Sequence, residues 1–381
     1  MLTPLAKINQ MKKITIIILL NSPFDLQNYN RTGIPVLRKY FRVVVLDFTN
    51  WLASNINKVA FKKHDYEAVE TVNNGEELVN IINKLKPTHA LDYLGNVNDK
   101  LKIIEIIKRA SVKYVVQRLA PIVDMPVPQK ILSSIFRNPM RILDRLFIKL
   151  FEDSKPFSGS SPDLAIVAGS KYLDNFTIKS KVIINAGSED YFTYKTCKEC
   201  SVKVEVNSGE PYILFIDDCI AESDDYLLNN TSNKIDQQLY YKLLDELLEK
   251  IELVSGLSVI VAAHPNGKRN SSYRKNFGNR EVHFGLTAQL SEQCALALTH
   301  YSTAISFPIL WRKPIIIITV KTLSDDMNIY LFIKSIIYYL KCPSLPIDAK
   351  QIDEKAVYFQ NNNYNKEAYN EYINRFIKKH N

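Results

Sequence analysis

A histidine and a pair of hydroxyl residues stand at the ends of two apolar segments, and their types suit chemistry on a phosphate group. His264 follows a β-branched run and precedes Pro265, which keeps a strand from continuing. Ser302 and Thr303 come shortly after the apolar residues Leu296–Leu298 and open a helical pattern. An imidazole can donate a hydrogen bond to an anionic oxygen, and the free N–H groups at a helix start attract phosphate. We therefore expect His264 to act on a phosphate leaving group that Ser302 and Thr303 hold.

The same residue types also have ordinary structural roles. A single histidine is more often structural than catalytic. Ser and Thr are good helix N-caps, because their hydroxyls accept hydrogen bonds from the first N–H groups of a helix. Capping and phosphate binding use the same N–H groups, so Ser302 and Thr303 alone do not separate the two interpretations. The companion His264 favours phosphate binding.

Polar residues also follow the strand that we predict at Tyr212–Ile216. Asp217 and Asp218 come directly after it, where carboxylates can hold the ribose or the base edge of a nucleotide. Paired aspartates also suit a metal ion, but the sequence has no Asp-x-Asp motif, so no metal site is predicted. The predicted nucleotide-binding residues are Asp217, Asp218, Pro265, His300 and Tyr301.

Two further polar segments end strands in the first half of the chain. Asp92 lies in the predicted strand His89–Leu94 and precedes Gly95, and a carboxylate at such a strand end is a candidate general base. Gly187–Asp190 follows the predicted strand Lys181–Ile184. A segment that reaches the space between two domains and a turn with a helix cap are equally good interpretations of it.

Length and charge restrict the classes of protein that are possible. The chain has 381 residues, which is long for one core and fits two domains of about 150–200 residues. Apolar residues make up 46% and charged residues 23%, as in soluble globular proteins. The formal charge of +9 favours anionic partners such as nucleotides, phosphates or an anionic membrane face. No nucleic-acid partner is predicted, because the basic residues are dispersed and no helix-turn-helix, zinc-finger or RNP pattern occurs.

The cysteines indicate neither disulfides nor a metal. There are five, an odd number without a disulfide framework, which indicates a reducing cytoplasm. Cys197 and Cys200 have the spacing of a zinc knuckle, but no second pair follows them. We therefore predict that this segment is a solvent-exposed linker, and we expect no metal and no other cofactor.

Two segments bear on membranes. The apolar run Ile14–Leu20 is short and β-branched and lacks a small-residue cleavage site, so we predict a first strand rather than a signal peptide. No stretch reaches the roughly 18 apolar residues that span a bilayer. Residues 129–151 place an apolar stripe opposite a basic face. This segment suits binding at an anionic membrane interface, and it equally suits a helix packed on the sheet with its charges solvated.

Strand and helix patterns alternate along the chain, which predicts βαβ units and parallel sheets. The polar stretch Thr193–Glu210 separates two such halves, so the expected fold class is α/β, with two Rossmann-like domains facing a central cleft. We predict an N-terminal domain at 1–195, a C-terminal nucleotide-binding domain at 205–360, and a final helix in 361–381 that packs back on the first domain. The predicted strands are Ile14–Leu20, Arg42–Leu46, His89–Leu94, Lys113–Val116, Asp163–Val167, Lys181–Ile184, Tyr212–Ile216 and Pro314–Val320, with others before His264 and His300; the predicted helices are Glu76–Leu85, Lys100–Arg109, Ile235–Val254 and Asn365–Lys379.

Two Rossmann-like halves with a His-Pro strand end and a Ser-Thr helix start resemble the GT-B glycosyltransferases of bacterial surface polysaccharides. The likeness is greatest to the sialyltransferase and polysialyltransferase group, which acts with CMP-activated nonulosonic acids; it is specific over residues 210–320 and architectural before them. The resemblance implies that His264 is the acid for the departing phosphate, that Ser302 and Thr303 hold this phosphate, and that Asp92 is the base. It also implies that the first domain binds the acceptor and the second the donor. Teichoic-acid glycerophosphotransferases share a similar His-Pro and Ser-rich pair.

The expected function is thus an inverting, metal-independent glycosyltransferase. It would move a nonulosonic acid from a CMP-linked donor onto an O-antigen (lipopolysaccharide), capsule or lipooligosaccharide glycan. The pair of glutamates eight residues apart that marks many retaining enzymes is not evident near Ser302. The expected partners are the nucleotide-sugar donor, a glycan or lipid-linked glycan acceptor and, through 129–151, an anionic membrane surface, which gives a cytoplasmic protein peripheral on the inner face of the membrane. A CDP-polyol phosphotransferase of the teichoic-acid type and a non-catalytic sugar-nucleotide-binding protein are the alternatives.

Overall fold

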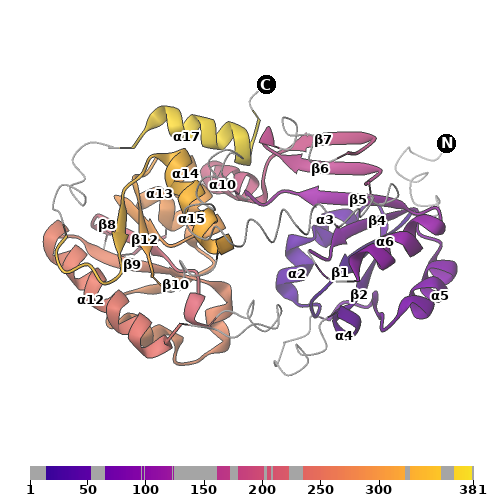
Figure 1. Ribbon diagram of the computed structural model, residues 1–381, viewed down its shortest axis with the longest axis horizontal. Coiled ribbons are helices and arrows are strands. Elements are labelled where there is room, and N and C mark those ends of the chain that lie inside the picture. The colour runs from indigo at the N-terminus through magenta and orange to yellow at the C-terminus, as the bar shows by residue number, and fades with distance from the viewer. Residues whose placement is uncertain are drawn as a thin grey trace, which may run out of the picture.

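Two parallel sheets flanked by helices make up the protein, as Figure 1 shows for the computed structural model. The structure describes residues 14–52, 65–95, 97, 99–121, 123, 161–171, 179–200, 204–206, 209–222, 235–321, 327–352 and 364–379. Every strand pairing in these ranges is parallel. The predicted α/β class with two Rossmann-like domains is therefore confirmed.

The first sheet contains seven strands in the order β3-β2-β1-β4-β5-β6-β7. These are β1 (Thr15–Leu20), β2 (Arg42–Asp47), β3 (Val69–Thr71), β4 (His89–Tyr93), β5 (Lys113–Arg118), β6 (Leu164–Ala168) and β7 (Val182–Ala186). The helices of this half are α2 (Leu26–Arg31), α3 (Ile34–Leu37), α4 (Thr49–Leu52), α5 (Gly75–Leu85), α6 (Lys100–Arg109) and α10 (Glu189–Cys200). The central strand β1 is buried along its whole length, because α5 and α6 pack on one face of the sheet and residues around α3 on the other.

The second sheet contains six strands in the order β10-β9-β8-β11-β12-β13. These are β8 (Tyr212–Ile216), β9 (Ser258–Ala263), β10 (Val282–Phe284), β11 (Leu296–Thr299), β12 (Ile315–Thr319) and β13 (Ser344–Pro346). Helix α12 (Gln237–Ser255) packs on one face, and α13 (Thr287–Gln293), α14 (Ser306–Leu310), α15 (Met327–Leu340) and α17 (Lys366–Tyr372) pack on the other. Short helical turns are η3 (Ile220–Glu222), η4 (Pro265–Arg269), η5 (Tyr273–Phe277), η6 (Thr303–Ile305) and the π-helical η8 (Ile373–Ile377).

Local capping explains where the longer helices begin and end. Asn74 accepts a hydrogen bond from the backbone N–H of Glu77 at 3.0 Å, which fixes the start of α5. Asp236 does the same for α12 through the N–H of Leu239 at 3.1 Å. Helix α12 ends at Gly256, whose φ of 68° lies in the left-handed region that glycine adopts without strain.

The strand order reverses once in each sheet, and this locates the ligand-binding edges. In the first sheet the chain adds β2 and β3 on one side of β1 and then returns to place β4 on the other. In the second sheet β9 and β10 lie on one side of β8, and β11 follows on the other. Ligands of open α/β sheets bind outside the carboxyl ends of the strands at such switch points. The candidate edges are therefore those after β1 and β4, and after β8 and β11.

The segment predicted to be an exposed linker proves to be a helix that packs on the second domain. Residues Thr193–Cys200 belong to α10, which contacts α13 and α14 (Figure 1). Cys197 is buried against Ala288 and Phe307. Most side chains of this segment are exposed, as predicted, but the segment is helical, and Cys197 is buried because its partners lie about 90 residues or more further along the chain.

The C-terminal segment contacts both domains. In α17 the Tyr369 hydroxyl donates to the carbonyl oxygen of Lys313 at 2.8 Å, so this helix is fixed to the second domain. The following turn η8 crosses the end of β6, where the N–H of Ser170 donates to the carbonyl oxygen of Asn374 at 2.9 Å. A Cβ atom at Gly169 would lie 2.2 Å from the carbonyl oxygen of Arg375, so this crossing requires glycine.

The predicted strands are all present, and β8 and α6 have the predicted bounds. The edge strands β3, β10 and β13 were not predicted, because each has only three residues. The amphipathic segment 129–151 lies outside the described residues.

Candidate active site

The carboxyl ends of β8, β9 and β11 place three predicted site residues side by side at one edge of the second sheet. In the register of the sheet, Asp218 after β8 is level with His264 after β9 and with Tyr301 after β11. Neighbouring strands lie about 4.8 Å apart, so groups that follow β9 and β11 are separated by about 10 Å. His264 and the Ser302–Thr303 segment therefore lie on opposite sides of Asp218, at the switch point.

Asp217 holds the end of β9 in place. Its Oδ2 accepts a hydrogen bond from the backbone N–H of His264 at 3.3 Å and another from the hydroxyl of Tyr273 in η5. Its Oδ1 accepts from the N–H of Cys219 at 3.0 Å. The carboxyl is buried, and this burial raises its pKa, while the hydrogen-bond donors oppose the rise. Asp217 therefore positions His264 instead of facing a ligand, and Tyr273 is a partner that the sequence did not reveal.

His264 caps the turn η4, and the cap determines its tautomer. Its Nδ1 accepts a hydrogen bond from the backbone N–H of Asn266 at 3.2 Å. A neutral imidazole with an accepting Nδ1 carries its proton on Nε2. The side chain is partly exposed, and the exposed Pro265 begins the turn. The ring is thus oriented as a hydrogen-bond donor through Nε2.

Asp218 links β8 to the segment after β11. Its Oδ2 accepts hydrogen bonds from the backbone N–H groups of His300 at 3.2 Å and Tyr301 at 3.1 Å, and the side chain of Ser302 also bonds to it. Burial raises the pKa of this carboxyl to about 7, and the repulsion from Asp217 adds to the rise. Asp218 is nevertheless partly exposed, so it has one side open to a ligand.

The two hydroxyl residues have different surroundings. The Ser302 hydroxyl accepts from the N–H of Ala304 at 3.3 Å, which caps η6, and it also bonds to Asp218. Thr303 is exposed, and its hydroxyl makes no hydrogen bond within the described ranges. The capping interpretation thus holds for Ser302, while Thr303 has a hydroxyl available for a phosphate.

His300 and Tyr301 differ in the same way. His300 is fully buried, its Nδ1 bonds to the carbonyl oxygen of Ile318 at 2.8 Å, and its Nε2 bonds to the Tyr240 hydroxyl at 3.0 Å. Burial lowers its pKa to about 4, so the ring is neutral. Because both ring nitrogens bond within the protein, His300 supports the strand end. Tyr301 is partly exposed and lies edge-on to Phe332.

In the first sheet, Asp92 is enclosed by its neighbours and is only 3% exposed. Its Oδ1 accepts from the N–H of Leu94 at 2.9 Å, and its Oδ2 accepts from the Tyr114 hydroxyl at 2.6 Å. The ammonium group of Lys100 lies 2.7 Å from the same Oδ2 and also donates to the carbonyl oxygen of Gly95 at 2.7 Å. These contacts favour a role in fixing the strand end.

A second carboxylate group, at Gly187–Asp190, lies where the first sheet meets the second domain. Ser188 caps α10, because its hydroxyl accepts from the N–H of Tyr191 at 3.2 Å. Glu189 is exposed and interacts with Arg31. Asp190 interacts with Ser306 at the start of α14. This segment therefore forms a capped turn, and Asp190 contacts the second domain.

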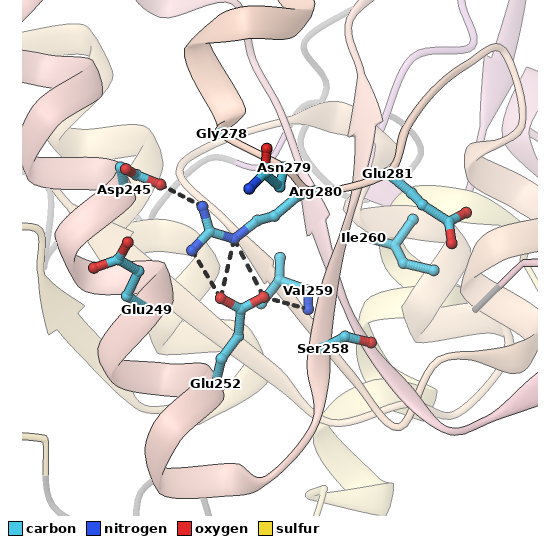
Figure 2. Close-up of a pocket in the computed structure, with 10 residues that line it drawn as sticks. All are labelled: Asp245, Glu249, Glu252, Ser258, Val259, Ile260, Gly278, Asn279, Arg280 and Glu281. Carbon is cyan, nitrogen blue, oxygen red and sulfur yellow. Dashed lines mark hydrogen bonds and ion pairs between the residues drawn. The ribbon is translucent and has the colours of Figure 1, made fainter. Parts of the chain in front are cut away.

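The hollow in Figure 2, of about 540 Å³, lies at the opposite end of the second sheet, where β9 begins. Arg280 projects into it and pairs with Asp245 and with Glu252, whose Oε2 is 2.7 Å from its Nη2. Glu252 also accepts from the N–H of Val259 at 2.8 Å. The ion pairs and this hydrogen bond join α12 to Arg280 and to the start of β9. The polar residues that line the hollow therefore have a structural role.

No group of three or more His, Cys, Asp or Glu in the described ranges is arranged to hold a metal ion. None of the helices described is long and apolar enough to cross a membrane.

Comparison with known proteins identifies the fold. No protein-family model matches the sequence, and no curated protein is similar to it in sequence. The structure is similar to the calicheamicin glycosyltransferase CalG4, with a TM-score of 0.51 and 10% identity over 95% of this chain and 92% of that chain. The UDP-GlcNAc 2-epimerase of Methanocaldococcus jannaschii, in complex with UDP-GlcNAc and UDP, has a TM-score of 0.49 and 14% identity over 96% of both chains. The two domains have the GT-B fold, as the sequence resemblance implied.

Proposed function

We propose that this protein is an inverting, metal-independent glycosyltransferase that uses a nucleotide-activated sugar. The donor that we propose is a CMP-linked nonulosonic acid, and the acceptor is a glycan of the bacterial surface. The observation that carries the proposal is the placement of His264 and Thr303 on opposite sides of Asp218, at the switch point of a GT-B fold. The likeness in fold to a glycosyltransferase, CalG4, supports it.

In this proposal the leaving phosphate binds between His264 and Thr303. His264 directs Nε2–H as a donor, and Asp217 and the N–H of Asn266 hold its backbone and ring. Thr303 offers a hydroxyl from the other side. Fixed donors that face a developing negative charge stabilise the transition state more than the ground state. In the proposed reaction, His264 stabilises the phosphate oxygen as the bond to the sugar breaks.

The nucleotide would occupy the edge next to this phosphate. Asp218 and Tyr301 are partly exposed there, so they are the residues that we propose for its ribose or base. Asp217 and His300 are buried and act indirectly, because they hold the backbone on which these side chains stand. The peripheral membrane position rests on residues 129–151, and we retain it as a proposal for a lipid-linked acceptor.

Nucleotide binding and product analysis test the proposal. CMP, CDP, UDP and GDP are titrated against thermal unfolding, where a ligand at about 100 times its Kd adds roughly 2.7 kcal/mol of stability. We expect CMP to stabilise the protein, and we expect CMP release from CMP-N-acetylneuraminate to require a glycan acceptor and to survive EDTA. Phosphate found in the product would instead identify a phosphotransferase, and binding without turnover would identify a binding protein.

A further inference from the structure

Glu189 stands where the first sheet meets the second domain. It follows β7 and is the first residue of α10, the helix that packs on α13 and α14 (Figure 1). Its neighbour Asp190 interacts with Ser306, three residues after Thr303. Glu189 is therefore one residue away from a direct contact with the segment that offers the phosphate-binding hydroxyl.

On its other side, Glu189 interacts with two residues at the carboxyl edge of the first sheet. These are Arg31, the last residue of α2, and Tyr93, the last residue of β4. The Arg31 guanidinium lies 6.0 Å from the centre of the Tyr93 ring, and the Tyr93 hydroxyl donates to Gln117 at 2.7 Å. An aromatic ring, a guanidinium with several donors and a carboxylate are together suited to hold the hydroxyls of a sugar.

The surroundings of Glu189 suit a proton acceptor better than those of Asp92. Glu189 is exposed, so a substrate hydroxyl can approach it, whereas Asp92 is enclosed and paired with Lys100. Partial desolvation raises the pKa of Glu189, and the charge of Arg31 opposes part of this rise. A carboxylate with a raised pKa is a stronger base while it stays ionised at neutral pH.

We propose that Glu189 is the general base of the sugar transfer, and that Arg31 and Tyr93 form the acceptor subsite with it. The inference rests on the proposed function. The Glu189 carboxylate takes the proton of the acceptor hydroxyl, and the hydroxyl oxygen forms the new bond to the anomeric carbon of the donor. The bond from this carbon to the phosphate oxygen breaks, and its electron pair leaves with the nucleotide, which His264 stabilises.

Other titratable groups near Glu189 can also affect the pH dependence of the reaction rate. Arg31 faces Glu189 from α2 and Tyr93 from β4, and burial raises the pKa of Tyr93, so this hydroxyl stays uncharged near neutral pH. Asp190 lies on the same helix, and burial raises its pKa to about 7, so it titrates in the range of interest. Lys378 of the C-terminal segment lies 4.7 Å from the ring centre of Tyr191, the next residue along α10. The Asp190→Asn variant must therefore be measured beside any variant of Glu189.

The test compares Glu189→Gln with three other variants in the full-length protein. The controls are Glu199→Gln, an exposed carboxylate near the end of the same helix, Asp92→Asn and Asp190→Asn. Rates of CMP release from CMP-N-acetylneuraminate are measured from pH 5 to 9 with and without acceptor glycans, and the Kd for CMP is measured by calorimetry. We expect Glu189→Gln to lower the acceptor-dependent rate by about 100-fold or more and to abolish its fall at acid pH. The Kd for CMP should not change.

Each outcome decides one of the two claims. A Glu189→Gln variant with the rate and the pH profile of the wild type would overturn the role of Glu189 and leave the proposed function intact. The same holds if only Asp92→Asn loses the acid limb of the profile. A wild-type protein that releases no CMP from CMP-N-acetylneuraminate with any acceptor, and that none of the four nucleotides stabilises, would overturn the proposed function, and the role of Glu189 with it.

Discussion

The carboxylate of Asp218 accepts a hydrogen bond from the backbone N–H of Tyr301 at 3.1 Å, across the switch point of the second sheet. The neighbouring Asp217 accepts one from the N–H of His264 at 3.3 Å. Two adjacent aspartates after β8 thus fix the backbones that follow β9 and β11. These two hydrogen bonds set the distance between His264 and the segment that carries Thr303. The positions of both residues therefore depend on the end of β8.

Replacing His264 by Ala should lower turnover by about 100-fold or more, because the donor to the leaving phosphate is lost. Initial rates of CMP release give this number. His283→Ala is the matched control, since His283 lies on the neighbouring strand β10, where its ring pairs with Glu281 at 3.1 Å. Equal rates for His264→Ala and the wild type, with unchanged thermal unfolding, would remove His264 from the mechanism.

Ser302→Ala and Thr303→Ala should behave differently. Loss of the Ser302 hydroxyl removes the cap of η6 and a bond to Asp218, so we expect a stability loss of about 1 kcal/mol. Loss of the exposed Thr303 hydroxyl should leave stability unchanged and weaken CMP binding. Denaturant unfolding and calorimetric titration of each variant separate the two effects. Unchanged CMP affinity in Thr303→Ala would show that this hydroxyl does not hold the phosphate.

Residues that end buried parallel strands were predictable from the sequence. His264, Asp217 and Thr303 each follow an apolar run, and parallel sheets bring such ends to one edge. The partners of these residues were not predictable in the same way. Tyr273 lies 56 residues from Asp217 in the chain, and no local pattern indicates their hydrogen bond.

Burial decided the other differences between sequence and structure. His300 and Tyr301 are neighbours in the sequence, yet His300 is fully enclosed because Tyr240 and Ile318 bind both of its ring nitrogens. Asp92 ends a strand as a base should, but Lys100 from the next helix covers it. Such contacts depend on which side chains the tertiary structure brings together, and no local pattern in the sequence reveals them.

Asp190 should make the protein less stable as the pH rises from about 4 to above 7. Burial raises the pKa of its carboxyl from 3.8 to about 7 in the folded protein, with Ser306 lowering it and Glu189 raising it. Folding therefore favours the protonated form. The contribution of Asp190 to the free energy of unfolding is fully present below the pKa that the carboxyl has in the unfolded chain. It is lost as the pH rises through the pKa of the folded protein, and each pKa unit is worth about 1.4 kcal/mol.

Asp190→Asn should cancel this loss, because the amide is uncharged at every pH. We expect the variant to gain stability over the wild type at pH 8 and to show little difference at pH 4.5. The free energy of unfolding in urea at the two pH values is the measurement. Asp218 has a raised pKa as well, but it is present in both proteins, so the difference isolates Asp190. A pH-independent difference would contradict the assignment.

The last prediction concerns the membrane and rests on the sequence of residues 129–151. An apolar stripe opposite basic residues should bind anionic vesicles, and each cation near such a surface is worth about 1 kcal/mol. Replacing Arg137, Arg141 and Arg145 by Glu should release the protein from vesicles that contain phosphatidylserine, while transfer to a soluble acceptor continues. Binding of the wild type should weaken as salt is added, because ions screen the attraction. Vesicle sedimentation measures both effects, and equal partitioning of the two proteins would mean that the apolar stripe is ordinary core packing and that the peripheral-membrane proposal must be dropped.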